Sequence, residues 1–298
     1  MSIDITLAGH EKDLGGGFVV RRLLPSMQRR NVGPFIFFDH FGPVVAPPNE
    51  NHDVRPHPHI GLATVTYLFE GAMMHRDSIG SEQLIEPGAI NWMTSGRGIV
   101  HSERRPDHLR GTSYRMHGLQ LWTALPLAHE EDEPSFAHTP ADAIPDVDLG
   151  QARVRVLIGS AFGATSPVKA FSQTLYLDVM LPAGGAIELP PLAPEMAVYP
   201  VQGDLVIEAA TLPAGTMAVL RAGEATRIHA QGAARFAVVG GEPLDAPRHM
   251  WWNFVSSRKD RIIQASEDWQ AMRMGRVPGD DEFIPLPPTR FTAAEPRS

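Results

Sequence analysis

Two pairs of residues in this sequence could together bind one transition metal ion. One residue separates His57 from His59, and one residue separates His101 from Glu103. Alternate side chains of an extended chain point to the same face, so each pair can present both of its side chains to one point. If the two segments are neighbouring strands of a barrel, all four side chains converge. Three imidazoles and one carboxylate suit Fe, Mn, Co, Ni, Cu or Zn, and the donor set alone does not choose among these metals.

The alternative interpretation is that these histidines are ordinary surface or core residues without a metal-binding role. The chain has 13 histidines, so a single His-x-His pair would be unremarkable. The second pair, with the same spacing and a carboxylate, favours a metal site. The chain has no cysteine, which excludes disulfides, thiolate ligands and an iron–sulfur cluster. Any metal must therefore be held by histidines and carboxylates.

Composition and charge narrow the class of protein. With 298 residues and 43% hydrophobic content, the chain can bury one large core or two ordinary ones. Its formal net charge of −8 argues against direct nucleic-acid binding, which relies on Lys and Arg to neutralise phosphates. No apolar stretch approaches the roughly 18 residues that cross a bilayer, and the first residues lack the features of a secretion signal. We expect a cytoplasmic protein with no membrane contact.

The elements that would position the site are mainly strands. Short apolar runs recur between turn signals in a chain with 27 Gly and 27 Pro, which is typical of a sandwich or barrel. One helix is expected after Ser257, with an apolar stripe that includes Ile262 and Trp269 and a stop at Gly275. The strand-like runs are Phe35–Phe38, Thr64–Phe69, Ile90–Met93, Val154–Ile158, Leu175–Leu181, Val198–Ile207, Met217–Leu220 and Phe236–Val239.

We expect two domains joined by an acidic, proline-containing connector. The expected boundaries are 1–134 for a metal-binding barrel, 135–150 for the connector, 151–276 for a metal-free barrel with the terminal helix, and 277–298 for an extended or disordered tail. A weak internal repeat supports this division. It places Leu189 and Pro191 opposite His57 and His59, and the region from His229 to Gln231 opposite the second pair, so only the first half keeps a ligand set.

Two long runs carry a resemblance to a known family. The segment from His57 to Gly71 and the segment from Trp92 to Glu103 closely resemble the pirin family. The resemblance extends over most of the chain. It implies an all-β bicupin of two stacked antiparallel β-barrels of jelly-roll type, with iron in the N-terminal barrel. The family's ligands fall on His57, His59, His101 and Glu103. Many pirins have Glu where this chain has Ala63, so substrate handling could differ.

The resemblance implies an enzyme. Pirins are similar to quercetin dioxygenases, which open a flavonol ring with O2 and release carbon monoxide. In that scheme Glu103 takes the proton of the flavonol hydroxyl, which Lewis-acid binding to Fe(II) makes more acidic. We take Trp92, Met93 and Gln120 as candidate lining residues for a flat aromatic substrate.

The alternative is a binding module. Other pirins resemble redox-responsive regulators, in which a change between Fe(II) and Fe(III) alters affinity for a transcription factor or a metabolic enzyme. The acidic balance of this chain favours a protein partner over DNA. Four other features have ordinary structural interpretations beside functional ones: His75 and His117 as strand histidines, the pair Arg104 and Arg105 as solvent-facing, and Trp251–Phe254 as packing.

Overall fold

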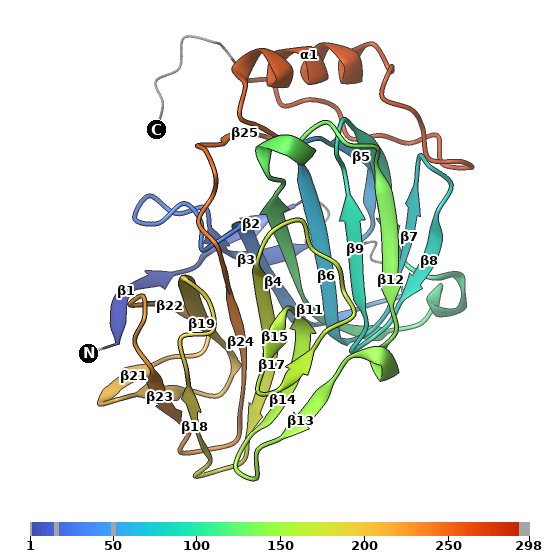
Figure 1. The fold of residues 1–298 in the computed structure, drawn as a ribbon. Coiled ribbons are helices and arrows are strands. Elements are labelled where there is room, and N and C mark those ends of the chain that lie inside the picture. The colour runs from blue at the N-terminus through green and yellow to red at the C-terminus, as the bar shows by residue number, and fades with distance from the viewer. Residues whose placement is uncertain (1, 15–17, 49–51, 292–298) are drawn as a thin grey trace. The chain divides into compact units, whose positions relative to one another are not determined.

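The computed structural model describes residues 2–14, 18–48 and 52–291. Within these residues the regular secondary structure is almost entirely strands, with one α-helix, α1 (Lys259–Gln270). No helix in this part of the chain has the length and apolar character needed to span a membrane. The expected all-β class with a short C-terminal helix is thus confirmed (Figure 1). The 3-10 turns are η1 (Asp107–Leu109), η2 (Leu127–His129) and η3 (Ala141–Ala143).

The chain forms two compact units that interleave along the sequence. We call them the apolar unit and the histidine unit. We expected each domain to be one continuous stretch of the chain. Instead, the N-terminal strand β1 (Ile3–Ala8) pairs with β22 (Thr216–Leu220), which lies more than 200 residues later in the same unit. Strand pairing joins residues that are far apart in sequence, and it cannot be predicted from the composition of each segment. The apolar unit comprises Met1–Lys12, Val20–His40 and Thr139–Leu244, and the histidine unit comprises Asp13–Val19, Phe41–His138 and Asp245–Ser298.

The apolar unit contains two antiparallel sheets around one apolar core. Val156 and Leu177 of the larger sheet and Ile187 and Ile228 of the smaller one belong to the same buried cluster. The larger sheet has the order β1-β22-β19 (Glu195–Gln202)-β24 (Ala234–Gly241)-β17 (Thr174–Leu181)-β14 (Arg153–Ile158)-β13 (Asp146–Asp148). The smaller has the order β18 (Ala186–Leu189)-β23 (Thr226–His229)-β20 (Leu205–Ile207)-β21 (Ala210–Leu212), and β15 (Ser160–Ala161) pairs with β16 (Ala164–Thr165).

The histidine unit is also built from two antiparallel sheets. Each unit is a pair of antiparallel sheets of the expected jelly-roll type, and among the described residues its outer strands do not pair to close a ring. The larger sheet includes β12 (Ser135–Thr139), β9 (Ile90–Thr94), β6 (Leu62–Glu70), β11 (Tyr114–Ala124) and β4 (Phe35–Ala46), in that order. The smaller has the order β5 (Val54–His59)-β10 (Ile99–Arg104)-β7 (Met73–Asp77)-β8 (Glu82–Ile85). The remaining strands are β2 (His10–Asp13), β3 (Val19–Leu24), β25 (His249–Trp251) and β26 (Phe254–Ser256).

The stretch expected to be a connector contains regular structure. Strand β12 lies beside β9 in the histidine unit, and β13 pairs with β14 in the apolar unit. The acidic residues of this region sit on strands and turns with exposed faces. A high local charge therefore does not mark a structureless linker here.

Helix α1 covers the outer face of the smaller sheet of the histidine unit. Its buried residues Ile262, Ala265 and Trp269 join a cluster with Val100 of β10 and Val277 of the following tail. The tail was expected to be extended or disordered, and its described part, up to residue 291, is extended and packs on this face. Both faces of β10 are consequently buried, although its residues alternate in type.

The helix begins later than its sequence signal indicates. Arg258 occupies the N-cap without a side-chain capping bond, and α1 ends at Gln270, before the expected stop at Gly275. The hydroxyl of Ser257, the expected cap, instead donates to Glu130 Oε2 at 2.8 Å. A tertiary contact has replaced the local cap.

Candidate metal centre

Strands β5 and β10 bring the two predicted pairs of site residues together. They pair antiparallel, with His57 directly opposite His101 and His59 opposite Ile99. The register shifts after His101, so that Glu103 lies opposite Val54. Side chains alternate along both strands, and Val100 packs outward against the helix, so His101 points inward.

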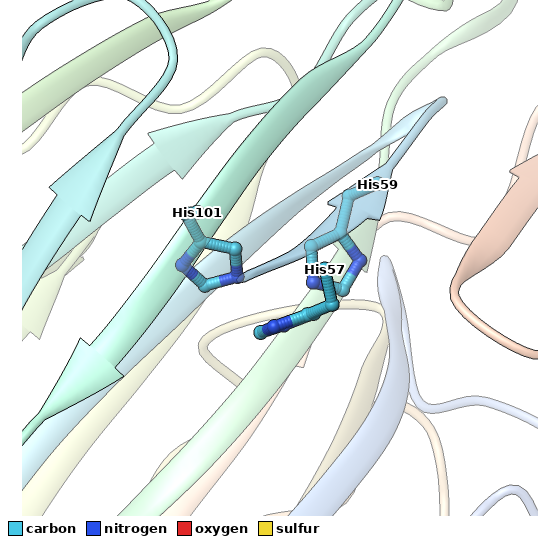
Figure 2. A group of neighbouring side chains, drawn as sticks. All are labelled: His57, His59 and His101. Carbon is cyan, nitrogen blue, oxygen red and sulfur yellow. The ribbon is translucent and has the colours of Figure 1, made fainter. Parts of the chain in front are cut away.

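The three histidines converge on one point. Their ligand atoms all lie within 4.8 Å of one another, and each residue is buried. Ring centroids are 4.3 Å apart for His57 and His101, and 5.1 Å apart for His59 and His101. Figure 2 shows the three rings turned toward a common centre. This arrangement can hold a metal ion.

Backbone carbonyls set the orientation of two of these rings. Nδ1 of His57 donates to the carbonyl oxygen of Arg55 at 2.9 Å, and Nδ1 of His59 donates to that of Asn253 at 3.2 Å. Because a carbonyl can only accept, the proton of each neutral ring sits on Nδ1. Nε2 is left with a free lone pair, as a metal ligand requires.

Burial keeps the three imidazoles neutral. It lowers the pKa of His57 from 6.5 to about 4. Burial also lowers the pKa of His59 and of His101 well below 6.5, and the neighbouring histidines lower both further. Nε2 of His101 is buried and has no hydrogen-bond partner in the part of the chain that the structure describes. A buried nitrogen without a partner costs free energy, which a metal ion at this point would recover. The donor set therefore fits a divalent metal.

Glu103 is adjacent to this cluster but is not part of it. The convergent group consists of the histidines alone. Glu103 is 9% exposed, and burial raises the pKa of its carboxyl group from 4.5 to about 7. The register shift between His101 and Glu103 was not detectable from the spacing of the sequence motif. Its role as the fourth ligand stays a proposal.

The larger sheet supplies the wall that faces the histidines. The ring of Trp122 lies 5.0 Å from that of His59, so the inner face is the one that carries Trp122. Trp122 pairs with Thr64, Thr64 with Met93, and Gln120 with Thr66, which places these residues on that face. The hydroxyl of Thr66 donates to Gln120 Oε1 at 2.8 Å.

The same register corrects one candidate lining residue. Trp92 pairs with Val65, one residue out of phase with Met93, so it faces away from the histidines. Its indole Nε1 donates to Thr94 on that opposite face at 3.1 Å. Met93 and Gln120 keep the positions that a substrate contact needs. Trp92 does not.

A hairpin from the end of the chain completes the site. Strands β25 and β26 form a tight turn whose Asn253 carbonyl anchors His59. Trp252 in this turn has φ +53°, a conformation that is costly for a bulky residue. The amide of Val255 donates to the carbonyl of Ile60 at 3.2 Å, directly after the anchored histidine. The Trp251–Phe254 segment packs, as interpreted, but its backbone also touches a site residue, which sequence reasoning missed.

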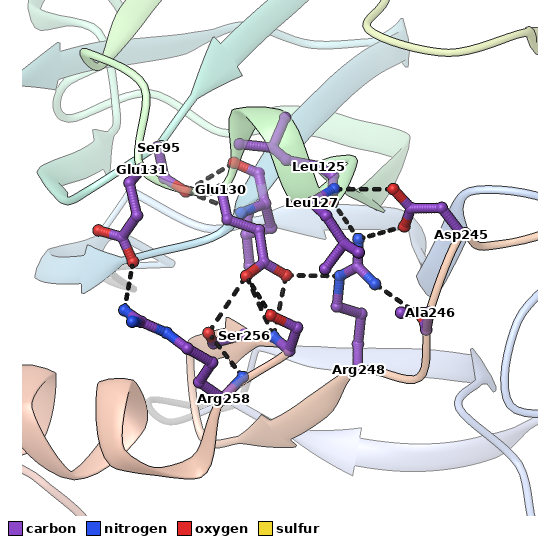
Figure 3. A network of polar contacts seen from close by, with 12 residues as sticks. Ser95, Leu125, Leu127, Glu130, Glu131, Asp245, Ala246, Arg248, Ser256 and Arg258 are labelled. Carbon is purple, nitrogen blue, oxygen red and sulfur yellow. Dashed lines mark hydrogen bonds and ion pairs between the residues drawn. The ribbon is translucent and has the colours of Figure 1, made fainter.

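A buried ion pair holds this hairpin in place. Glu130 accepts from the amide of Ser257 at 2.9 Å and forms an ion pair with Arg248 at 2.6 Å (Figure 3). The side chains of Glu130 and Arg248 are 6% and 2% exposed. Arg248 also donates to the carbonyl of Leu125 and to Asp245. Glu130 is thus a structural clamp, which its place in an acidic run of the sequence did not indicate.

Of the remaining candidates, His75 lies beside His101, with ring centroids 5.2 Å apart, and the others bind other segments. Arg104 forms an ion pair with Asp280 of the tail at 2.8 Å. The ring of His117 lies 4.8 Å from that of Phe69. A groove of about 960 Å³ between α1 and the tail is lined by Pro56 and Val100, which face away from the histidines. That groove is therefore separate from the candidate metal centre.

The chain is similar to known proteins over most of its length. The family model for pirin matches residues 17–123, and the model for the pirin C-terminal cupin domain matches residues 176–275. A pirin-like protein of Caulobacter vibrioides is 46% identical over 96% of this chain and 99% of its own length. Human pirin is 32% identical over 92% of this chain and 93% of its own. The crystal structure of a quercetin 2,3-dioxygenase from Acinetobacter baumannii superposes with a TM-score of 0.89 at 35% identity, covering 98% of this chain and 97% of that one.

Proposed function

The chain belongs to the pirin family of cupin proteins, and from this premise we propose that it binds one Fe(II) ion and acts as a flavonol dioxygenase of the quercetin 2,3-dioxygenase type. The observation that carries the proposal is the buried, neutral triad of His57, His59 and His101. A similar protein of known structure carries the name of this activity. The proposed ligand set adds the carboxylate of Glu103.

The chain's own residues supply the acid–base chemistry. A bound Fe(II) ion would supply Lewis acidity toward the flavonol hydroxyl and redox chemistry toward O2. Glu103 accepts the hydroxyl proton. Burial alone raises the pKa of its carboxyl group to about 7, and a bound cation would lower it again, so the group would be ionised and able to accept a proton at neutral pH. Oxygen then opens the ring, and carbon monoxide leaves.

The wall opposite the histidines orients the substrate. Trp122 and Met93 offer flat and adaptable apolar contacts to an aromatic ring. Gln120 and Thr66 offer polar atoms on the same face. These four residues set which flavonol substituents are accepted.

Turnover by the iron-loaded protein tests the proposal. Wild type and His101→Ala are loaded with Fe(II) without oxygen, then mixed with quercetin and O2 while flavonol loss and carbon monoxide are recorded. We expect both signals in wild type and neither in His101→Ala. The matched control is His229→Ala, on the smaller sheet of the apolar unit, which should keep full turnover. Stoichiometric iron without turnover in wild type would contradict the dioxygenase proposal.

A further inference from the structure

Two buried residues of β7 stand beside the metal centre without belonging to it. His75 is 2% exposed and Asp77 is 0% exposed. Strand β7 pairs with β10 so that Asp77 lies opposite His101 and His75 lies opposite Glu103. Their side chains therefore share the inner face with the proposed ligands. A buried carboxylate and a buried imidazole are costly to place in a core, and the ligand set does not account for them.

A chain of hydrogen bonds connects these residues to His101. Asp77 Oδ2 lies 3.1 Å from His75 Nε2, and His75 Nδ1 lies 3.4 Å from His101 Nδ1. The carboxylate is itself fixed, because Asp77 Oδ1 accepts from the amides of Ile79 and Ser81 at 3.1 and 2.8 Å. The His75 ring stacks on Phe136 with centroids 4.3 Å apart. Each member of the chain is thus held in one orientation.

The direction of the chain follows from what each atom can do. A carboxylate only accepts, so Nε2 of His75 carries a proton, and in the neutral ring Nδ1 of His75 is then the acceptor. Nδ1 of His101 must then donate, which leaves the lone pair on Nε2 of His101. That atom is the buried nitrogen that has no hydrogen-bond partner among the described residues. Asp77 determines, through His75, which nitrogen of His101 can bind a metal.

We propose that His75 and Asp77 are positioning residues that hold His101 in the tautomer and orientation required for metal binding. The inference rests on the metal-binding part of the proposed function and goes beyond it. His57 and His59 are anchored by backbone carbonyls, which substitution cannot remove. His101 is instead anchored by the side chains of His75 and Asp77. Substitution of these two residues can therefore change the metal affinity of the site.

Asp77→Asn is the sharpest test, because it reverses the direction of the hydrogen bond between residue 77 and His75 and keeps the shape of the side chain. The amide oxygen replaces Oδ1 as acceptor for the amides of Ile79 and Ser81, so the amide NH2 faces His75. Nε2 of His75 must then accept and Nδ1 must donate, which moves the His101 proton onto Nε2. We expect the ¹⁵N NMR spectrum of the metal-free protein to show this tautomer change at His101. Zn(II) affinity, measured by chelator competition, should fall about 10- to 100-fold.

A pair of variants at His75 makes the test independent of Asp77. His75→Phe keeps a ring against Phe136 but removes both nitrogens, and we expect a similar loss of Zn(II) affinity. His75→Asn places an amide near the former Nδ1 and should restore part of that affinity, which a merely structural role would not predict. The control Glu82→Gln removes the exposed partner of Arg76 on the neighbouring strand and should leave affinity unchanged.

The outcomes separate the inference from the function it rests on. Zn(II) does not carry out oxygen chemistry, so the result does not depend on turnover. Wild-type affinity and an unchanged His101 tautomer in both Asp77→Asn and His75→Phe would overturn the inference and leave the metal site standing. Failure of the wild-type protein to bind Zn(II) would overturn both.

Discussion

The smaller sheets of the two units pair their strands alike but fill their inner faces differently. In the histidine unit β5 pairs with β10 and sets His57 opposite His101. In the apolar unit β18 pairs with β23 and sets Ile187 opposite Ile228. The isoleucines join a continuous apolar core, whereas the imidazoles converge on one another. One strand arrangement thus supports a packed core in one unit and a metal site in the other.

The difference shows what a binding site costs. A fully buried Ile contributes about 1.5–3 kcal/mol by leaving water. A buried imidazole nitrogen without a partner contributes nothing comparable and carries a desolvation penalty. The histidine unit therefore gives up folding free energy at the positions where it gains ligands, as functional sites often do.

Copying the apolar pattern into the histidine unit should have the largest effect. We expect His57→Ile combined with His101→Ile to reduce the bound metal from one ion per chain to none. Metal-free stability should increase, because each Ile gains about 1.5–3 kcal/mol by leaving water and a buried imidazole gains nothing comparable. Metal analysis after loading and urea unfolding with a chelator present are the two measurements. Retained metal in the double variant would refute the assignment of the triad.

Breaking the clamp under the hairpin should have the next largest effect. Glu130→Gln removes the buried carboxylate partner of Arg248 and leaves it paired only with the more exposed Asp245, which should cost about 1–3 kcal/mol of unfolding free energy. Metal affinity should fall as well, since the hairpin carries the carbonyl that orients His59.

The neighbouring residue offers a matched control for the clamp. Glu131 is about half exposed and pairs with Arg258 and Arg261. Glu131→Gln should therefore cost about 1 kcal/mol or less. Equal effects of the two substitutions on unfolding and on metal affinity would show that the clamp does not support the site.

Local patterns predicted the histidine strands because alternation and motif spacing are properties of a few adjacent residues. The facing positions of His57 and His101 follow from such patterns once the two strands pair. The anchor at Asn253 could not be predicted, because it joins residues far apart in sequence through a backbone atom. Repeat alignment also misplaced one pair: Ile228 points into the apolar core, while His229, the residue aligned with the second motif, faces the other way.

Glu103 should make the stability of the metal-free protein depend on pH. Burial raises its pKa from 4.5 to about 7, so the folded state holds the proton more tightly than the unfolded state. The stabilisation is complete below pH 4.5 and is lost as pH rises through 7, by roughly 3 kcal/mol. Glu103→Gln should lack this loss. Burial lowers the pKa of His57 to about 4, which makes stability rise with pH. This contribution is the same in wild type and in Glu103→Gln, so it cancels when the two are compared. A pH-independent difference would contradict the burial of a titrating carboxyl group.

The smallest expected effect compares one methylene group in each unit. Ile228→Val and Ile99→Val both shorten a fully buried side chain, and each should cost about 0.5–1.5 kcal/mol of unfolding free energy. Their effects on metal binding should differ. Ile228 lies in the apolar core, so its substitution should leave Zn(II) affinity unchanged. Ile99 lies directly opposite His59, so the space created beside that ring should lower affinity measurably. If both variants weaken metal binding equally, the two inner faces are coupled, and the site depends on the packing of a unit that contributes none of its ligands.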